Sequence, residues 1–311
     1  MSNNLPHDRR VLAIQLLCEG MGIRPLARSI GCHHETLIRL GRDVGEGYAR
    51  LHDLLMVRLP TTRLELDEAW SFVHTKQGHL DPGDPKDWGD QYSFIALDAV
   101  NKAIVAYHVG KRTKANTIGF ALDIAARLLH EPQITSDGFE SYVDAIRIAF
   151  GEDADYAMLI KEYRAACAIE AAIRYQSADV RAVERKVVSG EPEEDLINTA
   201  YVERQNLTLR MLTRRFNWLT NGHSKLLRNH RAAMDLHVGY YNLCRPHLSL
   251  RGRTPAMAVG ATKAIWSVDR FVRECHALSN PAEPPIRPGD EHYTNWLRDQ
   301  QQAKRVRRTP R

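Results

Sequence analysis

Three acidic residues stand in sequence contexts that suit a metal site. Asp67 lies within an alternating segment, LELDEAW, Asp137 follows a short apolar segment in QITSDG, and Glu203 lies in the helical segment TAYVERQNLTLR. A carboxylate buried in a core strand is costly unless a partner compensates its charge. Divalent cations are suitable partners, and Mg²⁺ prefers oxygen ligands. Two such ions can hold the attacking and leaving oxygens of a phosphoryl displacement. The three acids are therefore candidate catalytic residues and candidate ligands of two Mg²⁺ or Mn²⁺ ions.

Each acid alone is weak evidence, because the chain has 38 acidic residues. Asp137 precedes a glycine, which is equally typical of an ordinary turn. In an alternating strand Glu65 shares the face of Asp67, whereas Glu68 points the other way. Other acids in the same region remain alternatives: Glu65, Glu68, Asp98 and Glu140.

The segment that contains Glu203 predicts a helix with one polar, functional face. Glu203, Asn206, Arg210 and Arg214 follow the spacing i, i+3, i+7 and i+11, which places them on one side of a helix. That face would offer a metal ligand, an amide and two guanidinium groups, which suits a phosphate backbone beside a metal site. A surface helix with Glu–Arg pairs is the alternative.

The first 60 residues favour a helix-turn-helix. Helices are expected at 10–19, 25–30 and 34–44. Ala27 would let two helices cross closely, Gly31 would form the turn, and Leu37 would anchor the second helix. The exposed second helix would then present His34, Thr36 and Arg39 to a DNA groove. A three-helix packing element without a DNA role is the alternative.

From residue 63 the apolar period changes to two, which predicts an α/β fold with a mixed sheet. The strands and helices alternate in the order β-β-β-α-β-α-β, which matches the ribonuclease-H-like order. The expected strands are 63–73, 92–99, 103–109, 133–136 and 155–161, with helices at 116–129 and 142–150. A further strand is expected at 185–188, and helices at 201–216 and 224–241.

The charge is distributed unevenly along the chain. The whole chain carries a formal net charge of +5, but residues 61–160 carry −7 and residues 204–311 carry +13. We expect a helix-turn-helix domain at 1–60, a ribonuclease-H-like catalytic domain with C-terminal helices at 61–268, and a basic, partly disordered tail at 269–311. The acidic region would bind cations, and the arginines of the basic region would contact a polyanion. Together the two regions are typical of one phosphoryl-transfer site.

Four segments resemble the DDE transposases of bacterial insertion sequences, in particular the small-element group with an ERxNLTxR context. They are DEAWSFV around Asp67, ITSDGFESY around Asp137, YVERQNLTLRMLTRR around Glu203, and YNLCRPHLSLRGRTPAMAVG at 241–260. The resemblance covers about residues 10–268. It implies a ribonuclease-H-like fold with Asp67, Asp137 and Glu203 as catalytic acids, and Arg210 at the position of a basic DNA-contacting residue.

The resemblance also implies a reaction and its partners. The reaction is metal-dependent hydrolysis at the element ends, followed by attack of the freed 3′-hydroxyl on target DNA, without a nucleotide cofactor. The helix-turn-helix would bind the terminal inverted repeats, and Arg210, Arg214 and Arg215 would hold DNA. A homodimer or higher oligomer on DNA is expected, since two ends must be joined. A non-catalytic helix-turn-helix regulator and a ribonuclease-H-like nuclease such as a resolvase are the alternatives.

Cysteine usage and hydropathy predict the compartment. The five cysteines are widely spaced without a CxxC motif, which favours free thiols in a reducing compartment. Some members of the resembled group carry a cysteine-rich zinc element before the helix-turn-helix. This chain has only Cys18 and Cys32 there, which puts zinc in doubt. The N-terminus lacks signal-peptide character and no apolar run is long enough for a bilayer. We therefore expect a protein of the bacterial cytoplasm, associated with the nucleoid, without a membrane partner.

Overall fold

A six-stranded mixed sheet occupies the centre of the computed structural model, which describes residues 5–163, 180–217, 220–288, 290 and 293. The strand order is β3-β2-β1-β4-β5-β6. The strands are β1 (Arg63–Val73), β2 (Gly89–Asp98), β3 (Ile104–Gly110), β4 (Gln133–Ser136), β5 (Tyr156–Tyr163) and β6 (Val180–Ser189). The first three strands form an antiparallel meander, β1 runs parallel to β4 and β4 to β5, and β6 closes the edge antiparallel to β5. The predicted fold class and strand sequence are confirmed.

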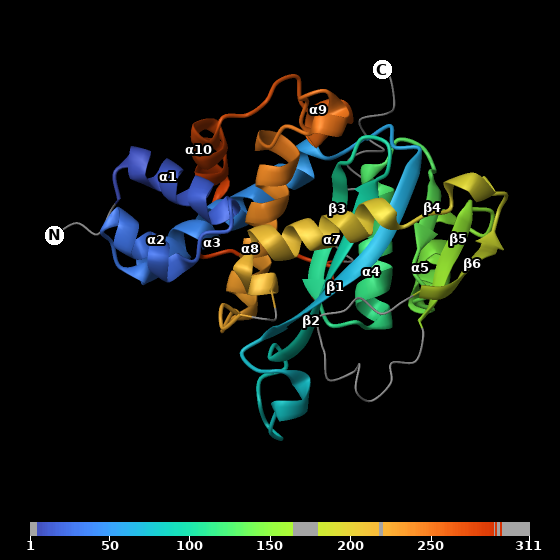
Figure 1. Ribbon diagram of the computed structural model, residues 1–311, viewed down its shortest axis with the longest axis horizontal. Coiled ribbons are helices and arrows are strands. Elements are labelled where there is room, and N and C mark those ends of the chain that lie inside the picture. The colour runs from blue at the N-terminus through green and yellow to red at the C-terminus, as the bar shows by residue number, and fades with distance from the viewer. Residues whose placement is uncertain (1–4, 164–179, 218–219, 289, 291–292, 294–311) are drawn as a thin grey trace, which may run out of the picture.

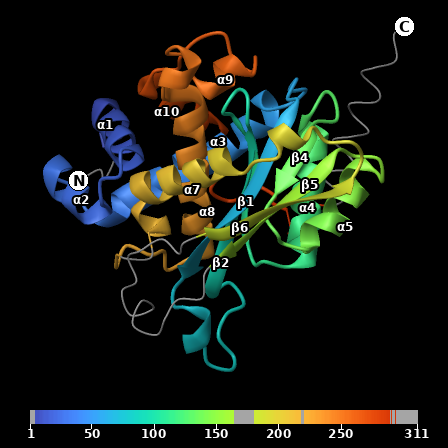
Figure 2. The same ribbon diagram turned by 45° about the vertical axis from the view of Figure 1, so that its right-hand side comes forward.

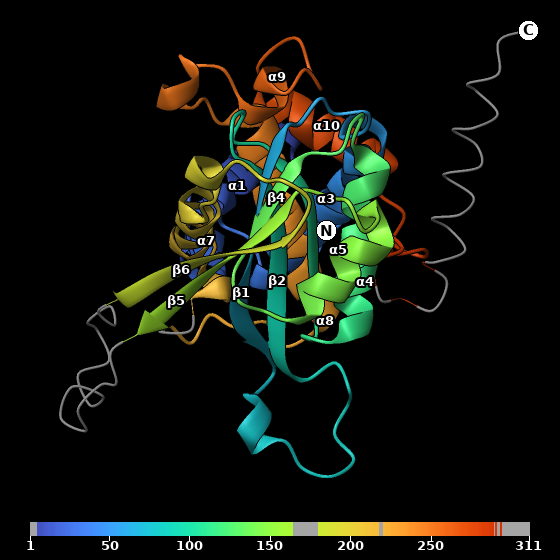
Figure 3. The same cartoon turned by 90° about the vertical axis from the view of Figure 1, so that its right-hand side faces the viewer.

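Helices cover both faces of the sheet. Figure 3 shows α4 and α5 on one face and α7 on the opposite face, with the strands between them. The longer helices are α1 (His7–Cys18), α2 (Ile23–Ile30), α3 (His34–Leu55), α4 (Lys114–Arg127), α5 (Ser141–Phe150), α7 (Ala200–Leu212), α8 (Leu227–Gly239) and α10 (Val268–Leu278). Apolar side chains of the sheet and of the N-terminal and C-terminal helices belong to one contiguous cluster of buried residues. The helical part and the sheet therefore share a core.

The α2–α3 turn has the geometry that its sequence predicts. Gly31 takes the left-handed conformation, with φ 72°, where glycine meets no steric penalty. Ala27 and Leu37 are buried on either side of the turn. His33 then caps α3, its ring nitrogen accepting a hydrogen bond from the backbone N–H of Glu35 at 3.4 Å. This arrangement agrees with the expected packing of two helices across a glycine turn.

The third helix is twice as long as expected, because α3 continues from His34 to Leu55. Two glycines in its second half lie at helix crossings. A Cβ at Gly45 would stand 2.2 Å from the carbonyl oxygen of Ala232 in α8, and one at Gly47 would stand 1.8 Å from that of Cys275 in α10. These close approaches offset the low helix propensity of glycine, and propensity alone does not reveal them. Figure 1 shows α3 running from the N-terminal helices toward α8 and α10.

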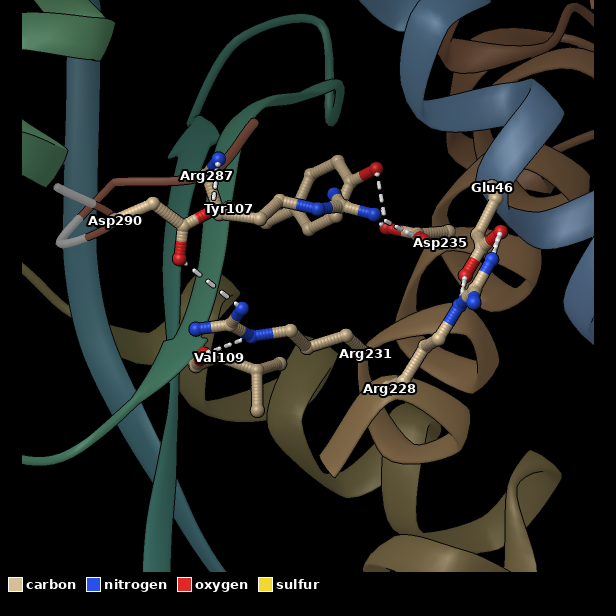
Figure 4. A network of polar contacts seen from close by, with 8 residues as sticks. All are labelled: Glu46, Tyr107, Val109, Arg228, Arg231, Asp235, Arg287 and Asp290. Atoms are coloured by element: carbon tan, nitrogen blue, oxygen red, sulfur yellow. Dashed lines mark hydrogen bonds and ion pairs between the residues drawn. The ribbon is translucent and has the colours of Figure 1, made fainter. Parts of the chain in front are cut away.

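The segment that was expected to form a partly disordered tail begins with an ordered helix. Helix α10 buries Phe271, Val272 and Cys275 against the rest of the protein. The following segment is held by charged contacts that Figure 4 shows. Arg287 donates to both carboxylate oxygens of Asp235 in α8, at 2.8 and 2.5 Å, and Asp235 also accepts from the Tyr107 hydroxyl. Scarce apolar residues suggested disorder, but buried ion pairs fix this segment instead. Residues 294–311 of the expected tail lie outside the described residues.

The loop between β1 and β2 projects from the body of the protein (Figure 2). At its base the rings of His74 and Trp88 stack with their centres 3.5 Å apart. In the described ranges, no helix is long and apolar enough to cross a membrane. Cys18, Cys32, Cys244 and Cys275 are free thiols, as expected, and Cys167 lies outside the described residues.

Candidate active site

The sheet register brings two of the predicted acids together. In the parallel pair β1–β4, Leu66 stands opposite Ser136. Asp67 and Asp137 are each one residue further along, so they lie side by side where β4 ends. The charge of Asp137 contributes to raising the pKa of Asp67, as expected for neighbouring carboxylates. Asp137 also accepts a hydrogen bond from the backbone N–H of Phe139, at 3.1 Å, which fixes the turn after β4.

Helix α7 brings the third acid to the same place. Glu65 on β1 accepts hydrogen bonds from the first backbone N–H groups of α7, those of Tyr201 at 2.8 Å and Val202 at 3.0 Å. A carboxylate at a helix N-terminus is a favourable partner for these unpaired donors, so Glu65 fastens α7 to β1. One turn further, the Asn206 amide donates to Asp67 at 2.8 Å. Glu203 lies on the same side of the helix, and its charge also raises the pKa of Asp67.

Burial and mutual repulsion shift the titration of these carboxyls upward. Burial, followed by the charge of Asp137, raises the pKa of Asp67 to about 6. Burial and Asp137 likewise raise the pKa of Glu68 to about 7. The pKa of Asp137 is also raised, chiefly by burial and further by Glu203. The carboxyl groups of Asp67, Glu68, Asp137 and Glu203 thus form an acid cluster, in which the negative charges repel one another.

Two cations of the chain partly balance this charge. Arg112, just after β3, lies 3.0 Å from Glu68 and 3.6 Å from Asp137. Lys161 on β5 forms an ion pair with Glu203, which also accepts from the Thr199 hydroxyl at 2.5 Å. In this arrangement, and within the part of the chain that is described, no three acidic, histidine or cysteine side chains form a ready metal-binding group.

The donors nevertheless fit a hard divalent cation. Asp67, Asp137 and Glu203 supply carboxylate oxygens, the ligands that Mg²⁺ and Mn²⁺ prefer. The carbonyl oxygen of the Asn206 side chain is buried beside them and has no hydrogen-bond partner. Buried polar atoms are normally satisfied, so an orphaned acceptor next to three acids suits a site that takes up a cation or its bound water.

The predicted polar face of α7 extends less far than expected. Arg210 lies on α7 and its buried Nε has no hydrogen-bond partner. The helix ends at Leu212, so Arg214 lies in the following 3₁₀ turn, Arg214–Phe216, and does not continue the helical face. Arg215 points inward: it donates to the Ser224 hydroxyl at 3.1 Å, and burial lowers its pKa to about 10. Arg214 thus corrects the extrapolated spacing, because a helix face is defined only as far as the helix continues.

The predicted DNA-facing residues of α3 differ in their accessibility. Arg39 is exposed and His34 is half-buried, whereas Thr36 is only 9% exposed and packs into the protein. Little of Thr36 is therefore accessible, although it lines the same open pocket as His34. His34 lines an open pocket of about 790 Å³ together with Arg24 and Arg28, two basic residues that the sequence pattern did not single out.

The alternative acids have structural partners of their own. Asp98 accepts hydrogen bonds from the backbone N–H groups of Val100 and Asn101, at 2.8 and 2.7 Å, and closes the β2–β3 turn. Glu140 is exposed at the start of α5. Glu65 anchors α7, as described above. Only Glu68 lies in the acid cluster itself, on the other side of β1 from Asn206.

Sequence reasoning missed the two cations of the cluster. The basic KRTK segment directly after β3 was an available signal for Arg112. No local pattern marked Lys161, because its position depends on the pairing of β5 with β4 and on the path of α7 across the sheet.

Comparisons with known proteins add little to this geometry. No protein-family model matches the chain, and no curated protein matches it. Among solved structures, it is similar to the piggyBac transposase in a synaptic complex with hairpin DNA, with 11% identity and a TM-score of 0.35. That match covers 94% of this chain and 74% of the other.

Proposed function

We propose that this protein is a DDE transposase that cleaves DNA at the ends of an insertion sequence and joins them to target DNA. The convergence of Asp67, Asp137 and Glu203 from β1, the end of β4 and α7 carries this proposal. These acids are far apart in the sequence but lie together beside a buried amide oxygen without a hydrogen-bond partner. Such an arrangement does not stabilise the fold. The four motif resemblances support the same conclusion independently.

In this function the three acids hold two Mg²⁺ or Mn²⁺ ions. Such ions would lower the pKa of a bound nucleophile and stabilise the charge that develops on the transferred phosphoryl group. The chain's own task is to position the acids. Asn206 orients Asp67 through its 2.8 Å hydrogen bond, and Glu65 fixes the start of the helix that carries Glu203.

The DNA would approach the acid cluster across basic and half-exposed residues. Arg210 on α7 and the exposed Arg214 beyond it would contact phosphates near the cleaved bond, and the α2–α3 unit with Arg39 and His34 would bind the terminal inverted repeats. Arg24 and Arg28, which line the same pocket as His34, add positive charge beside that unit. Two DNA ends must be joined in one complex, so we propose a homodimer or higher oligomer on DNA.

The decisive experiment uses the DNA that flanks the coding region, with any short inverted repeats found there. The purified protein is incubated with labelled end duplexes, target plasmid and Mg²⁺, and cleavage and strand transfer are separated on gels. Asp67→Asn should lower cleavage by a factor on the order of a thousand, since several kcal/mol of metal-dependent stabilisation are lost, while end binding persists.

Each other outcome identifies a rival function. Specific binding without cleavage by the unaltered protein would indicate a regulator that keeps only its helix-turn-helix. Cleavage without joining would indicate a nuclease such as a resolvase. Normal cleavage by the Asp67→Asn variant would refute the assignment of the three acids.

A further inference from the structure

Arg112 is held firmly inside the acid cluster. Its Nη2 lies 3.0 Å from Glu68 Oε2 and 3.6 Å from Asp137 Oδ2, and its Nε donates to the same Glu68 oxygen at 3.1 Å. Its guanidinium carbon stands 3.8 Å from the centre of the Phe139 ring and 5.6 Å from that of Tyr92. Two carboxylates and two aromatic rings thus define one position for this cation.

The two carboxylates that Arg112 contacts are not equivalent. The side chain of Glu68 is 2% exposed, accepts a hydrogen bond from Nε of Arg112 and lies 3.0 Å from its Nη2. Asp137 is 38% exposed, and its contact with Arg112 is longer than a hydrogen bond. Leaving the buried Glu68 without its cation would be expensive, whereas Asp137 can exchange partners at lower cost. Glu68 therefore holds Arg112 in place, and the contact between Arg112 and Asp137 is the weaker of the two.

We propose that Arg112 is a resident counter-ion that competes with the divalent metal for Asp137, and that Glu68 retains Arg112 when the metal binds. This inference rests on the proposed function, because it concerns how that site takes up its ions. Before metal binding, Arg112 offsets the repulsion between neighbouring carboxylates. When the metal arrives, the weaker contact with Asp137 is given up and the stronger one with Glu68 persists. Arg112 and Glu68 are positioning residues in this scheme.

The proposal predicts opposite effects for the two residues. Without Arg112, Asp137 has no competing cation, so metal should bind more tightly. Without the charge of Glu68, Arg112 loses its anchor and is drawn to Asp137, so metal should bind more weakly. A residue with a purely structural role would not give this pair of opposite shifts.

The test measures Mn²⁺ binding by electron paramagnetic resonance, using the full-length, metal-free protein without DNA at pH 8. Arg112→Gln should tighten Mn²⁺ binding about threefold to tenfold, the range that a partly exposed ion pair supports. Lys114→Gln is the matched control, because it removes the same charge two residues away. Lys114 pairs with Asp144 and not with the cluster, so its variant should stay within about twofold of the unaltered protein.

Glu68→Gln provides a second, independent readout. It should weaken Mn²⁺ binding about threefold to tenfold, and this loss should shrink in the Glu68→Gln, Arg112→Gln double variant, where no arginine is left to be released. Far-UV circular dichroism verifies that each variant is folded. If Arg112→Gln does not fold, unchanged or tighter Mn²⁺ binding by Glu68→Gln would still overturn the role of Arg112.

The outcomes separate this inference from the proposed function. Unchanged or weaker binding by Arg112→Gln, an equal gain in Lys114→Gln, or unchanged binding by Glu68→Gln would overturn the role of Arg112. If Arg112→Gln abolished DNA cleavage without altering Mn²⁺ affinity, Arg112 would serve the DNA phosphate instead, and the inference would also fail. If the unaltered protein bound Mn²⁺ no better than Asp67→Asn does, the proposed function itself would fail.

Discussion

Two of the regions that hold buried acids differ in the charge of the groups that surround those acids. In the region that Figure 4 shows, Asp235 is paired with Arg287 through two hydrogen bonds and Glu46 with Arg228 through another two. In the acid cluster, by contrast, the main neighbours of Asp67 are other acids and one amide. Both regions place carboxylates away from water, yet only the first supplies each of them with an arginine of its own.

This contrast distinguishes structural from functional carboxylates. A buried acid with its own bidentate arginine completes a local charge balance and joins two elements, here α8 and the segment after α10. Carboxylates that repel one another raise the energy of the folded protein and persist only where another requirement selects them. The acid cluster is therefore better suited to binding a cation than to stabilising the fold.

Removing one cation from the balanced region should have the largest effect on stability. Arg287→Met removes the cation of Asp235, whose side chain is 1% exposed, and leaves the hydrogen bond from the Tyr107 hydroxyl. An uncompensated buried charge costs about 3–5 kcal/mol, so the free energy of unfolding should fall by that amount. Urea denaturation monitored by fluorescence measures the change.

The exposed pair of Arg273 and Asp269 in α10 supplies the control for this change. Arg273→Met should leave the urea midpoint essentially unchanged, because exposed pairs contribute little. Mn²⁺ affinity should not respond to either substitution. A stability loss of equal size in the two variants would remove the distinction between the regions.

Removing a charge from the acid cluster should act in the opposite direction. Burial raises the folded-state pKa of Asp67 to about 6, above its usual value, so its ionisation lowers the stability of the folded protein as the pH rises from about 4 to about 6. Asp67→Asn should therefore raise the free energy of unfolding of the metal-free protein by about 1–2 kcal/mol at pH 8. Asp67 accepts hydrogen bonds from the Glu68 backbone N–H and from the Asn206 amide, and the asparagine oxygen can still accept one of them.

The pH dependence supplies the control for this gain in stability. At pH 4 Asp67 is protonated in the folded protein, so the advantage of the asparagine should largely disappear. Urea titrations of both proteins at pH 4 and pH 8, without metal, compare the two conditions. Destabilisation at both pH values would show that Asp67 contributes to the fold, and the comparison of regions would then be wrong.

Local patterns in the sequence predicted most of the fold. The period-two segment around Asp67 gave β1 with the correct ends, and Gln133–Ser136 was also predicted correctly as β4. The predictions were wrong where contacts between residues far apart in the sequence determine the length or the order of a segment. The length of α3 depends on Gly47 meeting the backbone of α10, and the order after α10 depends on Arg287 reaching Asp235.

The same division applies to the candidate site. The motifs indicated which three acids to examine, and the register of β1 with β4 then explains how two of them become neighbours. The partners of these acids escaped prediction. Arg112 and Lys161 reach the cluster through strand pairing and chain crossing, which no spacing along the sequence encodes. Thr36 shows the converse error, since a residue of suitable type proved to be only 9% exposed.

The pH dependence of metal binding should further distinguish the acid cluster from the region of balanced ion pairs, with a smaller expected effect than the stability changes above. A metal competes with protons for Asp67, and the pKa of this carboxyl in the metal-free protein is raised to about 6. Mn²⁺ affinity should therefore be nearly constant well above pH 6 and fall by about tenfold per pH unit below it. Mn²⁺ titrations by electron paramagnetic resonance between pH 5 and pH 8 would record this profile.

The matched variant for this profile is Arg287→Met, in which the acid cluster is intact. Its pH profile should coincide with that of the unaltered protein, even though its stability is much lower, because Asp235 does not belong to the cluster. If Asp67 had the pKa of an ordinary carboxyl, the Mn²⁺ affinity of the site would stay constant down to about pH 4. A profile that breaks near pH 4 would mean that Asp67 ionises as freely as a surface acid, and that mutual repulsion does not distinguish this region from the balanced one.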